Sequence, residues 1–557
     1  MTDPSQFTTP VAICGGGPVG LMLALFLDRH GIKSLVLNAE ETARWHPKGS
    51  THNSRTMEHY RRLGLGDRVR ALGLPQDHPT DVVYLTRFNA WELARLRMPS
   101  ERDKMRTALE AEQTAQNFEP IHRANQMYVE PLLLEQARSR ANITLRFGWT
   151  LDRFAEDADG VTLSAERSGG GERETWRAGY LVGCDGGQSR VRRDLGIRYH
   201  GLKTLDQPFL GGKMVSSYIK APGLYESGIG KRRGWQYWAV NPELRTCAVD
   251  LNGKDEFLFW TRLPEGRDKP EDEAVIRSFA RCSGADIRAS IIAHGTWTAG
   301  VALWAEHFWN GARVFLAGDA VHLFTPTGGF GMNTGIEDAA NLSWKLAAML
   351  QGWGGPALPG SYESERKPIA ARNTTAAHAL AQNVGAVPVS AAMEQDTAEG
   401  AAARRDAGAY LATFGEEFAS IGVQLGARYD GSPVIAADGT PPRDDYFEYR
   451  PSSVPGGRAP HFWLDPAGTP SRRSLFDRFG IGFTLLRLGP DAPDPGPLRA
   501  AANRRGLPLA VVDLPDGAAR DLYACDLALI RPDQHVAWRG KALPANCDAL
   551  LALISGH

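Results

Sequence analysis

The stretch Val11-Ala-Ile-Cys-Gly-Gly-Gly-Pro-Val-Gly20 decides the fold. Its first four residues form a short apolar run, which is typical of a parallel strand buried on both faces, and the glycines that follow predict a tight turn. The apolar segment 21–27 then predicts a buried helix, which Gly31 ends at its C′ position. Residues 34–37 predict a second strand. This βαβ unit places the chain in the α/β class, with a Rossmann-like nucleotide-binding domain.

The turn has the spacing of a dinucleotide-binding motif. Gly15, Gly17 and Gly20 stand between a strand and a helix, where glycines make the turn tight and let a pyrophosphate approach the helix N-terminus. An Asp or Glu normally ends the second strand and binds the ribose. Here that position is Asn38, which hydrogen-bonds but carries no charge. A glycine-rich turn without a ligand is the alternative.

Composition narrows the class of protein. At roughly 150 residues per domain, 557 residues allow two to four domains. Lys and Arg total 63 against 64 Asp and Glu, so the chain lacks the positive excess that nucleic-acid binding requires. The six cysteines form no C-x-x-C pair, which argues against a zinc or other metal site and favours a reducing cytoplasm. We expect neither a signal peptide nor a membrane span.

The chain divides into several predicted parts. Apolar runs at 180–184 and 314–317 predict two further buried strands, each leading into an Asp-Gly or Gly-Asp pair, and the aromatic-rich region 200–300 predicts an inserted sheet that covers a substrate. Residues 430–460 are rich in turn formers and predict a linker. We expect a nucleotide-binding domain from 1–80, 122–199 and 298–385, a substrate domain from 81–121 and 200–297, a helical segment and linker over 386–449, and a C-terminal unit over 450–557.

Two later motifs accompany the glycine turn in a fixed order. They are Gly183-Cys-Asp185-Gly186-x-x-Ser189-x-x-Arg192, and Ala317-Gly318-Asp319 followed by Pro326 and Gly328-Gly-Phe-Gly331-Met-Asn333. At these residues the sequence resembles the class A flavoprotein monooxygenases, the single-component aromatic hydroxylases, in their phenol hydroxylase and 2,4-dichlorophenol 6-monooxygenase-like branch. The resemblance covers roughly residues 11 to 372. It implies FAD held by all three motifs, and it implies that Asp185 also serves NAD(P)H.

The resemblance extends to cofactor-binding residues. It implies that Asp319 contacts the ribityl chain, that the segment 46–58 is a loop beside the flavin, and that Gln126 contacts FAD. Many members have Arg where Lys48 stands, which leaves the base that activates the phenol unidentified. The implied cofactor-binding residues are Gly15, Gly17, Gly20, Asn38, Lys48, Arg55, Gln126, Asp185, Asp319, Gly329, Gly331, Met332 and Asn333.

Candidate catalytic and substrate-binding residues come from the same loops and from the inserted sheet. Pro326 lies where the family often directs a backbone carbonyl toward the substrate. His52 is either a catalytic histidine or a surface or helix-capping one. Trp235 and Tyr237, two apart on one strand, are expected on the same face, where with Met214 they line an aromatic pocket. Core packing is the alternative for all three, and for Tyr237 as a catalytic residue.

The resemblance implies an FAD-dependent monooxygenase that hydroxylates a phenolic or aromatic substrate with NAD(P)H and dioxygen through a flavin C4a-hydroperoxide. A Baeyer–Villiger oxygenase on the same scaffold and an FAD-containing protein that sequesters an aromatic compound are the alternatives. The C-terminal unit resembles the thioredoxin-like tail of the phenol hydroxylases, but Cys525 and Cys547 stand alone, so no dithiol exchange is expected. The sequence leaves the substrate, the choice between NADH and NADPH, and the oligomeric state open, with a homodimer as one alternative.

Overall fold

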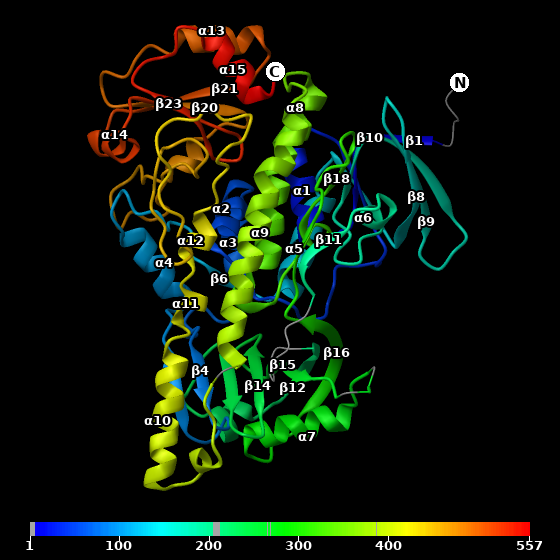
Figure 1. The fold of residues 1–557 in the computed structure, drawn as a ribbon, viewed down its shortest axis with the longest axis vertical. Coiled ribbons are helices and arrows are strands. Elements are labelled where there is room, and N and C mark those ends of the chain that lie inside the picture. The colour runs from blue at the N-terminus through cyan, green and yellow to red at the C-terminus, as the bar shows by residue number, and fades with distance from the viewer. Residues whose placement is uncertain (1–5, 204–211, 265, 268, 386) are drawn as a thin grey trace.

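The structure, a computed structural model, describes residues 6–203, 212–264, 266–267, 269–385 and 387–557. Residues 1–5, where the sequence predicts no signal peptide, lie outside the described residues. Figure 1 shows the C-terminal unit in orange and red at the top, the inserted sheet at the bottom, and the nucleotide-binding part with its long helices between them. Within the described ranges, no helix combines the length and apolar character that a membrane crossing requires.

The nucleotide-binding part is built on a seven-stranded sheet with the expected βαβ unit inside it. The strands are β1 (Gln6–Cys14), β2 (Ser34–Asn38), β7 (Ile143–Phe147), β8 (Trp149–Glu156), β9 (Val161–Arg167), β10 (Arg173–Gly183) and β18 (Val314–Leu316). β7, β2, β1, β10 and β18 pair in parallel, whereas β9 and β8 continue the sheet in antiparallel order. The carboxyl ends of parallel strands share one edge, so the segments that follow β1, β2, β10 and β18 meet there. The Rossmann-like α/β fold is confirmed.

Long buried helices pack against this sheet. α1 (Pro18–Arg29) starts with a proline in its first turn, where the missing N–H costs nothing, and it ends before Gly31, whose φ of +74° is the expected C′ conformation. α1 packs on α8 (Phe330–Gln351), and α8 on α9 (Leu358–Gly385). α8 begins at Phe330, inside the motif Gly328-Gly-Phe-Gly331, so its N-terminus lies at the edge of the sheet where the motifs meet.

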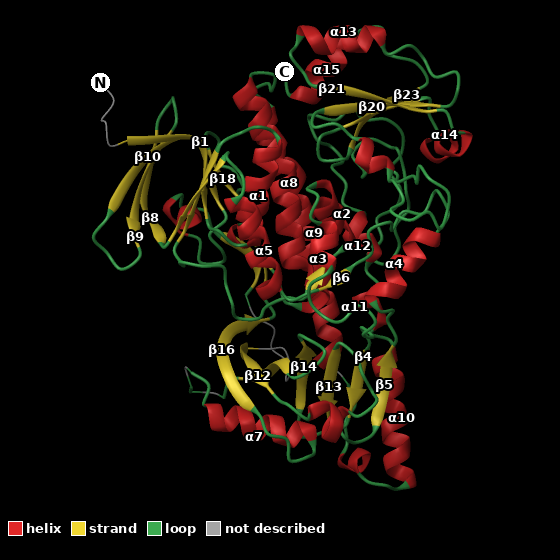
Figure 2. Ribbon diagram, turned by 180° about the vertical axis from the view of Figure 1, so that it is seen from behind, coloured by secondary structure: helices red, strands yellow, loops and turns green. Residues whose placement is uncertain are grey.

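The inserted sheet has two differently used faces. Its strands, in spatial order, are β16 (Ser290–Ala299), β12 (Gly212–Lys220), β15 (Glu256–Arg262), β14 (Arg245–Asp250), β13 (Gln236–Val240), β4 (Val82–Leu85) and β5 (Glu92–Leu96). One face packs on α7 (Asp272–Ser283) through Phe259 and Phe279. The other carries Trp238 and Trp260 and packs against α10 (Ala398–Ala412) through Leu411. Figure 2 shows this sheet below the helices of the nucleotide-binding part.

The C-terminal unit has the expected thioredoxin-like order. It contains β20 (Phe483–Leu488), α13 (Gly496–Arg504), β21 (Leu509–Leu514), α14 (Gly517–Tyr523), β22 (Leu527–Ile530), β23 (Val536–Gly540) and α15 (Cys547–Ser555). The strands lie in the order β21, β20, β22, β23, with β20 and β21 parallel and the other pairs antiparallel. This topology confirms the predicted thioredoxin-like fold of the C-terminal unit.

Shorter elements connect these parts. They are β3 (Thr51–His52), α2 (Ser54–Arg62), α3 (Gly66–Arg70), α4 (Glu101–Glu110), β6 (His122–Arg123), α5 (Gln126–Arg138), α6 (Arg190–Asp194), β11 (Tyr199–Leu202), η1 (Leu224–Ile229), β17 (Ala302–Ala305), η2 (Gly318–Ala320), β19 (His322–Leu323), η3 (Thr327–Gly329), η4 (Ala391–Glu394), α11 (Gly415–Phe418), α12 (Ile421–Leu425) and η5 (Leu475–Arg478). The predicted linker falls between α12 and η5, where the chain forms isolated bridges such as Arg428–Gly457.

A buried ion pair joins the C-terminal unit to the nucleotide-binding part. The Glu58 carboxylate on α2 accepts from Arg458 Nη2 at 2.5 Å and from its Nε at 3.1 Å. Both side chains are 1% exposed. A charge buried this deeply requires its partner, so the two parts depend on each other for charge neutrality.

Candidate active site

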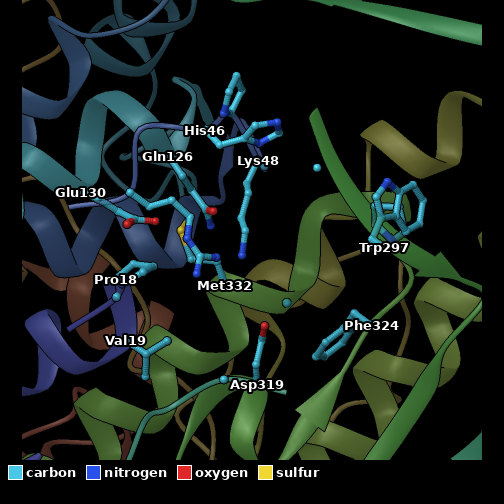
Figure 3. A pocket seen from close by; sticks show the side chains of 18 of the residues that line it. Pro18, Val19, His46, Lys48, Gln126, Glu130, Trp297, Asp319, Phe324 and Met332 are labelled. Atoms are coloured by element: carbon cyan, nitrogen blue, oxygen red, sulfur yellow. The ribbon is translucent and has the colours of Figure 1, made fainter. Parts of the chain in front are cut away.

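A cavity of about 730 Å³ lies between the carboxyl edge of the nucleotide-binding sheet and the inserted sheet. Figure 3 shows residues from both parts pointing into it. Twelve of the residues singled out from the sequence line it, although they come from segments that lie far apart in the chain. They are Gly15, Gly17, Asn38, Lys48, Gln126, Asp185, Trp235, Asp319, Pro326, Gly329, Gly331 and Met332.

Two helix N-termini face this cavity. Gly17 precedes α1 and Gly329 precedes α8, and no side chain among the described residues caps either helix, so the first backbone N–H groups can meet an anion. A Cβ on Gly17 would meet no atom of the described residues within 4 Å. Gly15 is different: its φ is +111° and a Cβ would lie 2.2 Å from the Cys184 carbonyl oxygen. The turn is therefore tight on the protein side and open on the cavity side.

Asn38 brings no charge to the turn, but its side chain hydrogen-bonds the backbone there. Its Oδ1 accepts from the Gly16 amide at 3.0 Å, and its Nδ2 donates to the Glu40 carbonyl at 3.0 Å. The nearest acidic side chain along the chain, Glu40, pairs with Arg44 at 3.0 Å. The uncharged Asn38 thus fixes the backbone at Gly16, in the glycine turn, and at Glu40, after β2. Both segments line the end of the cavity where the motifs meet.

Two aspartates mark the other motifs at this edge. Asp185 Oδ2 accepts from the amides of Arg190 and Val191 at 2.7 and 3.1 Å, while its Oδ1 is buried without a partner among the described residues. The Asp319 side chain points into the cavity (Figure 3), and Tyr199 donates to its carbonyl at 2.6 Å. A buried, unpaired carboxylate oxygen calls for a donor from a ligand.

A buried network fixes the backbone before Asp319. Asp338 accepts from the Gly318 amide at 3.1 Å, from Arg366 at 2.8 Å, and lies 2.7 Å from His322 Nε2. Burial alone would raise the pKa of Asp338, but His322 and Arg366 hold it below its ordinary value. Asp338 therefore stays ionised and orients the turn that presents Asp319.

Lys48 supplies positive charge inside the cavity. Figure 3 shows its side chain between Gln126 and Asp319. Desolvation, then repulsion from Arg44, lower its pKa, while desolvation raises the pKa of the nearby Glu130. The backbone of this region is tied to α5, because the Gln126 amide donates to the Gly49 carbonyl at 2.9 Å.

The loop before α8 is held close to β3. Gly328 and Gly329 have φ values of +75° and +66°, and a Cβ on Gly329 would lie 2.7 Å from Thr51 Cβ. Asn333 does not line the cavity; its Nδ2 donates to the carbonyls of Gly329 at 2.6 Å and Thr51 at 3.0 Å. The Asn333 side chain thus supports the loop, and the cofactor contact predicted for this residue stays a prediction.

The opposite end of the cavity is aromatic. Trp238 and Trp260 lie edge to face with centroids 6.4 Å apart, and Trp260 and Trp297 with centroids 6.2 Å apart. Trp235 packs edge-on against Phe418 at 6.2 Å. The Trp235 Nε1 is buried without a partner among the described residues, so this wall offers an indole donor and ring faces to an aromatic ligand.

Tyr237 does not share this wall with Trp235, contrary to the prediction. It lies on the α7 side of the sheet, where its hydroxyl donates to the Gly234 carbonyl at 3.0 Å. The amides of Trp235 and Gln236 both donate to the Asp81 carbonyl, at 2.8 and 3.2 Å. Two residues opposite one form a bulge, which shifts Trp235 out of the alternation that placed it with Tyr237. Tyr237 is a core residue in this structure.

Met214 and His52 are also placed in packed surroundings. Met214 is fully buried in the apolar cluster between the inserted sheet and α10. His52 is fully buried, with Nδ1 3.2 Å from the Tyr60 hydroxyl and Nε2 3.0 Å from the Ala124 carbonyl oxygen. Burial lowers the pKa of His52 to about 3, so the ring is neutral and both nitrogens are occupied. This geometry favours neither a surface nor a catalytic histidine.

Arg55 binds the C-terminal unit and not the cavity. It pairs with Glu58 at 2.6 Å and donates to the Gln534 side chain at 2.8 Å and to the Asp533 carbonyl at 2.6 Å. Arg55 is not among the described residues that line the cavity, and the cofactor contact predicted for it stays a prediction. Gly20, the last motif glycine, is a packing residue, because a Cβ there would lie 1.9 Å from the Gly15 carbonyl oxygen.

Three cavity residues come from the segment that the sequence treats as helical connection and linker: Glu417, Phe418 and Ser420. Glu417 Oε1 accepts from the Gly328 amide at 3.2 Å. Desolvation raises the pKa of Glu417 to about 7, although the Gly328 amide and the Arg123 charge oppose the rise. No motif in the sequence marks this glutamate.

Comparisons with known proteins agree with this geometry. A family model described as "FAD binding domain" matches residues 8–377, and one described as "Aromatic-ring hydroxylase, C-terminal" matches residues 452–556. The chain is 33% identical to the FAD-dependent monooxygenase apdD of Emericella nidulans, over 99% of this chain and 91% of that protein. It is 29% identical to the phenol 2-monooxygenase of a Pseudomonas species, over 98% of this chain and 92% of that protein.

A solved structure of the rebeccamycin biosynthetic enzyme RebC with reduced flavin superimposes with a TM-score of 0.87, at 31% identity and over 99% of both chains. The residues present here fit FAD: the turn is open at Gly17, two uncapped helix N-termini suit a pyrophosphate, and Asp185 keeps a buried oxygen for a donor. The resemblance seen in the sequence motifs is confirmed. The chain belongs to the FAD-dependent aromatic-ring hydroxylases.

Proposed function

We propose that this protein inserts one atom of dioxygen into a phenolic ring held against the tryptophan wall. The observation that carries the proposal is a single cavity that joins the motif edge of the nucleotide-binding sheet to Trp235 and Trp260 of the inserted part. A cavity with a nucleotide end and an aromatic end suits a cofactor and a planar substrate side by side.

The nucleotide end would hold the cofactor through backbone and side-chain groups. We assign the pyrophosphate to the turn at Gly17 and to Lys48, the ribityl chain to Asp319, and the flavin ring to the loop at Gly329 and Met332. When bound, FAD accepts a hydride from NAD(P)H and activates dioxygen for transfer to the substrate.

The aromatic end would orient the ring and exclude water. Trp238, Trp260 and Trp297 offer a rigid surface against which a planar ring packs, and the Trp235 indole N–H offers a donor to a substrate oxygen. Pro326 lines the cavity on the loop that links the two ends, and we propose that its carbonyl faces the substrate. Exclusion of water protects the activated oxygen from wasteful release as hydrogen peroxide.

The proposal extends to the location and the assembly of the protein. All six cysteines are unpaired in the structure, which supports our proposal of a reducing, cytoplasmic location. We leave the assembly state to measurement, with a homodimer as the predicted alternative to a monomer.

The test is a screen of monocyclic and polycyclic phenols for stimulated NAD(P)H oxidation by the FAD-loaded protein under ¹⁸O₂. We expect at least one phenol to yield a product that is heavier by one labelled oxygen atom. Stimulated oxidation that gives only hydrogen peroxide, with every phenol recovered unchanged, would refute the proposal.

A further inference from the structure

We propose that Glu417 is the base that removes the proton from the phenolic hydroxyl of the substrate. This assignment rests on the proposed function and names the one catalytic group that the sequence leaves unidentified. It is argued from the position of the carboxylate in the cavity.

Glu417 lies where the flavin loop meets the aromatic wall. It belongs to the one-turn helix α11, and its Oε1 accepts from the amide of Gly328, two residues after Pro326. The next residue, Phe418, packs on Trp235 with ring centroids 6.2 Å apart. In the part of the chain that the structure describes, Gly328 is the only hydrogen-bond donor to this carboxylate, so Oε2 is left for a ligand.

The other carboxylates of the cavity are placed for different tasks. Glu40 pairs with Arg44, and Asp185 accepts from two backbone amides at the nucleotide end. Glu130 projects from α5 next to Gln126, far along the cavity from Phe324 in Figure 3. Asp319 follows β18 at the motif edge. Glu417 differs from these carboxylates because the next residue, Phe418, packs on Trp235 at the aromatic end of the cavity.

His46 is the competing neutral base, but it lies at another wall. A Cβ on Gly295 of β16 would lie 2.9 Å from His46 Cε1, which places the imidazole against the edge strand of the inserted sheet. Desolvation lowers the pKa of His46, so its ring is uncharged at neutral pH. Glu417, by contrast, accepts a hydrogen bond from the Gly328 amide, on the loop where we place the flavin ring.

The charges around Glu417 suit a base that works near neutrality. The groups that face it are Arg123 of β6, Tyr84 of β4 and Cys247 of β14. Arg123 lies 4.0 Å from the Trp235 ring centroid, so a guanidinium charge stands beside the ring wall. With its pKa at about 7, Glu417 is half ionised at neutral pH, and Arg123 favours the phenolate that forms when the proton leaves.

The proton and electron balance of the step is simple. The substrate O–H bond breaks, its proton moves to Glu417 Oε2, and both bonding electrons stay on the substrate oxygen, where they enrich the ring. When one oxygen atom of dioxygen joins the ring, the other leaves as water with the two electrons that NAD(P)H supplies. The C–H proton at the hydroxylated carbon then leaves to solvent as the ring regains aromaticity. The proton on Glu417 returns to the original oxygen, which regenerates the carboxylate.

The experiment compares Glu417→Gln with Glu416→Gln in the FAD-loaded protein, with the phenol that the ¹⁸O₂ screen identifies. Glutamine keeps the acceptor for Gly328 but cannot take a proton. We expect Glu417→Gln to lower the rate of labelled product formation by about 10²-fold or more at pH 7, with FAD content retained. Glu416 is exposed on the same short helix and carries no assigned role, so its variant should match the wild type.

The pH profile provides a second readout. In the wild type, hydroxylation should rise as the pH passes through about 7, because the base acts only when deprotonated, and this rise should be absent in Glu417→Gln. If Glu417→Gln purifies without FAD, Glu417→Asp replaces it: an activity that still rises with pH supports the assignment, and a flat profile overturns it.

The possible failures are distinguishable. Labelled product from the wild type and equal labelled product from Glu417→Gln would overturn the role of Glu417 alone. No labelled product from the wild type would instead refute the proposed function, and the assignment of a phenol base with it.

Discussion

Alanine at Gly20 should lower the stability of the protein, whereas alanine at Gly17 should lower its affinity for FAD. A Cβ on Gly20 would lie 1.9 Å from the backbone carbonyl oxygen of Gly15, about 1 Å inside the 3.0 Å limit below which Cβ contacts essentially never occur. We expect Gly20→Ala to cost about 1–3 kcal/mol and to lower Tm by about 2–10 °C. A Cβ on Gly17 meets nothing within 4 Å, and its φ of −77° suits any residue. Gly17→Ala should therefore leave the stability of the flavin-free protein within about 1 kcal/mol of the wild type.

The methyl group at Gly17 should act on the cofactor instead. It would project into the space at the start of α1 where we assign the pyrophosphate, so we expect FAD affinity to fall at least about 10-fold, or about 1.4 kcal/mol. Thermal unfolding of the flavin-free protein and a flavin fluorescence titration measure the two effects separately. Wild-type FAD affinity in Gly17→Ala would refute the assigned pyrophosphate position, and an unchanged Tm in Gly20→Ala would refute the packing argument.

Three further outcomes follow from the buried and cavity-lining side chains. Trp235→Ala should raise hydrogen peroxide release per NAD(P)H, because it opens the aromatic wall to water, whereas Tyr237→Phe on the other face should not; a peroxide assay on both variants decides. Glu58→Gln should cost about 3–5 kcal/mol of unfolding free energy, because it leaves buried arginines unpaired, and chemical denaturation would show it. The double variant Cys525→Ser, Cys547→Ser should keep wild-type turnover in the labelled-oxygen assay, since burial raises the pKa of both thiols.

The sequence predicted the edge at which the motifs meet, because strands of a parallel sheet end together and each motif directly follows a strand. This explains why Gly15, Asp185 and Asp319 line one cavity. The alternation of side chains along the strand wrongly placed Tyr237 on the same face as Trp235. The bulge at Trp235 arises from its backbone hydrogen bonds, which the residue types do not reveal.

Contacts between distant segments escaped prediction altogether. Glu417 faces Arg123, although the two residues lie far apart in the sequence. The helix that carries Glu417 has only four residues, too few to show a hydrophobic periodicity. His52 on β3 and Arg55 on α2 belong to the segment expected beside the flavin, but their side chains turn toward Ala124 and Asp533. Which face of such a short element points to the cavity depends on tertiary neighbours, which one sequence does not display.

The ion pairs between α2 and the C-terminal unit also limit how relatives of this protein can be recombined. Glu58 lies between Arg55 and Arg458, and Arg55 donates to the backbone carbonyl of Asp533, so the segment beside the cofactor loop takes a countercharge and a hydrogen-bond acceptor from the far end of the chain. A chimaera that joins this nucleotide-binding part to the C-terminal unit of another hydroxylase inherits the flavin loop in full. We expect such a chimaera to lose stability unless the donor supplies an arginine at the position of Arg458, because Glu58 would otherwise lack the ion pair that joins the two parts. The donor sequence can be checked for this residue before any chimaera is made.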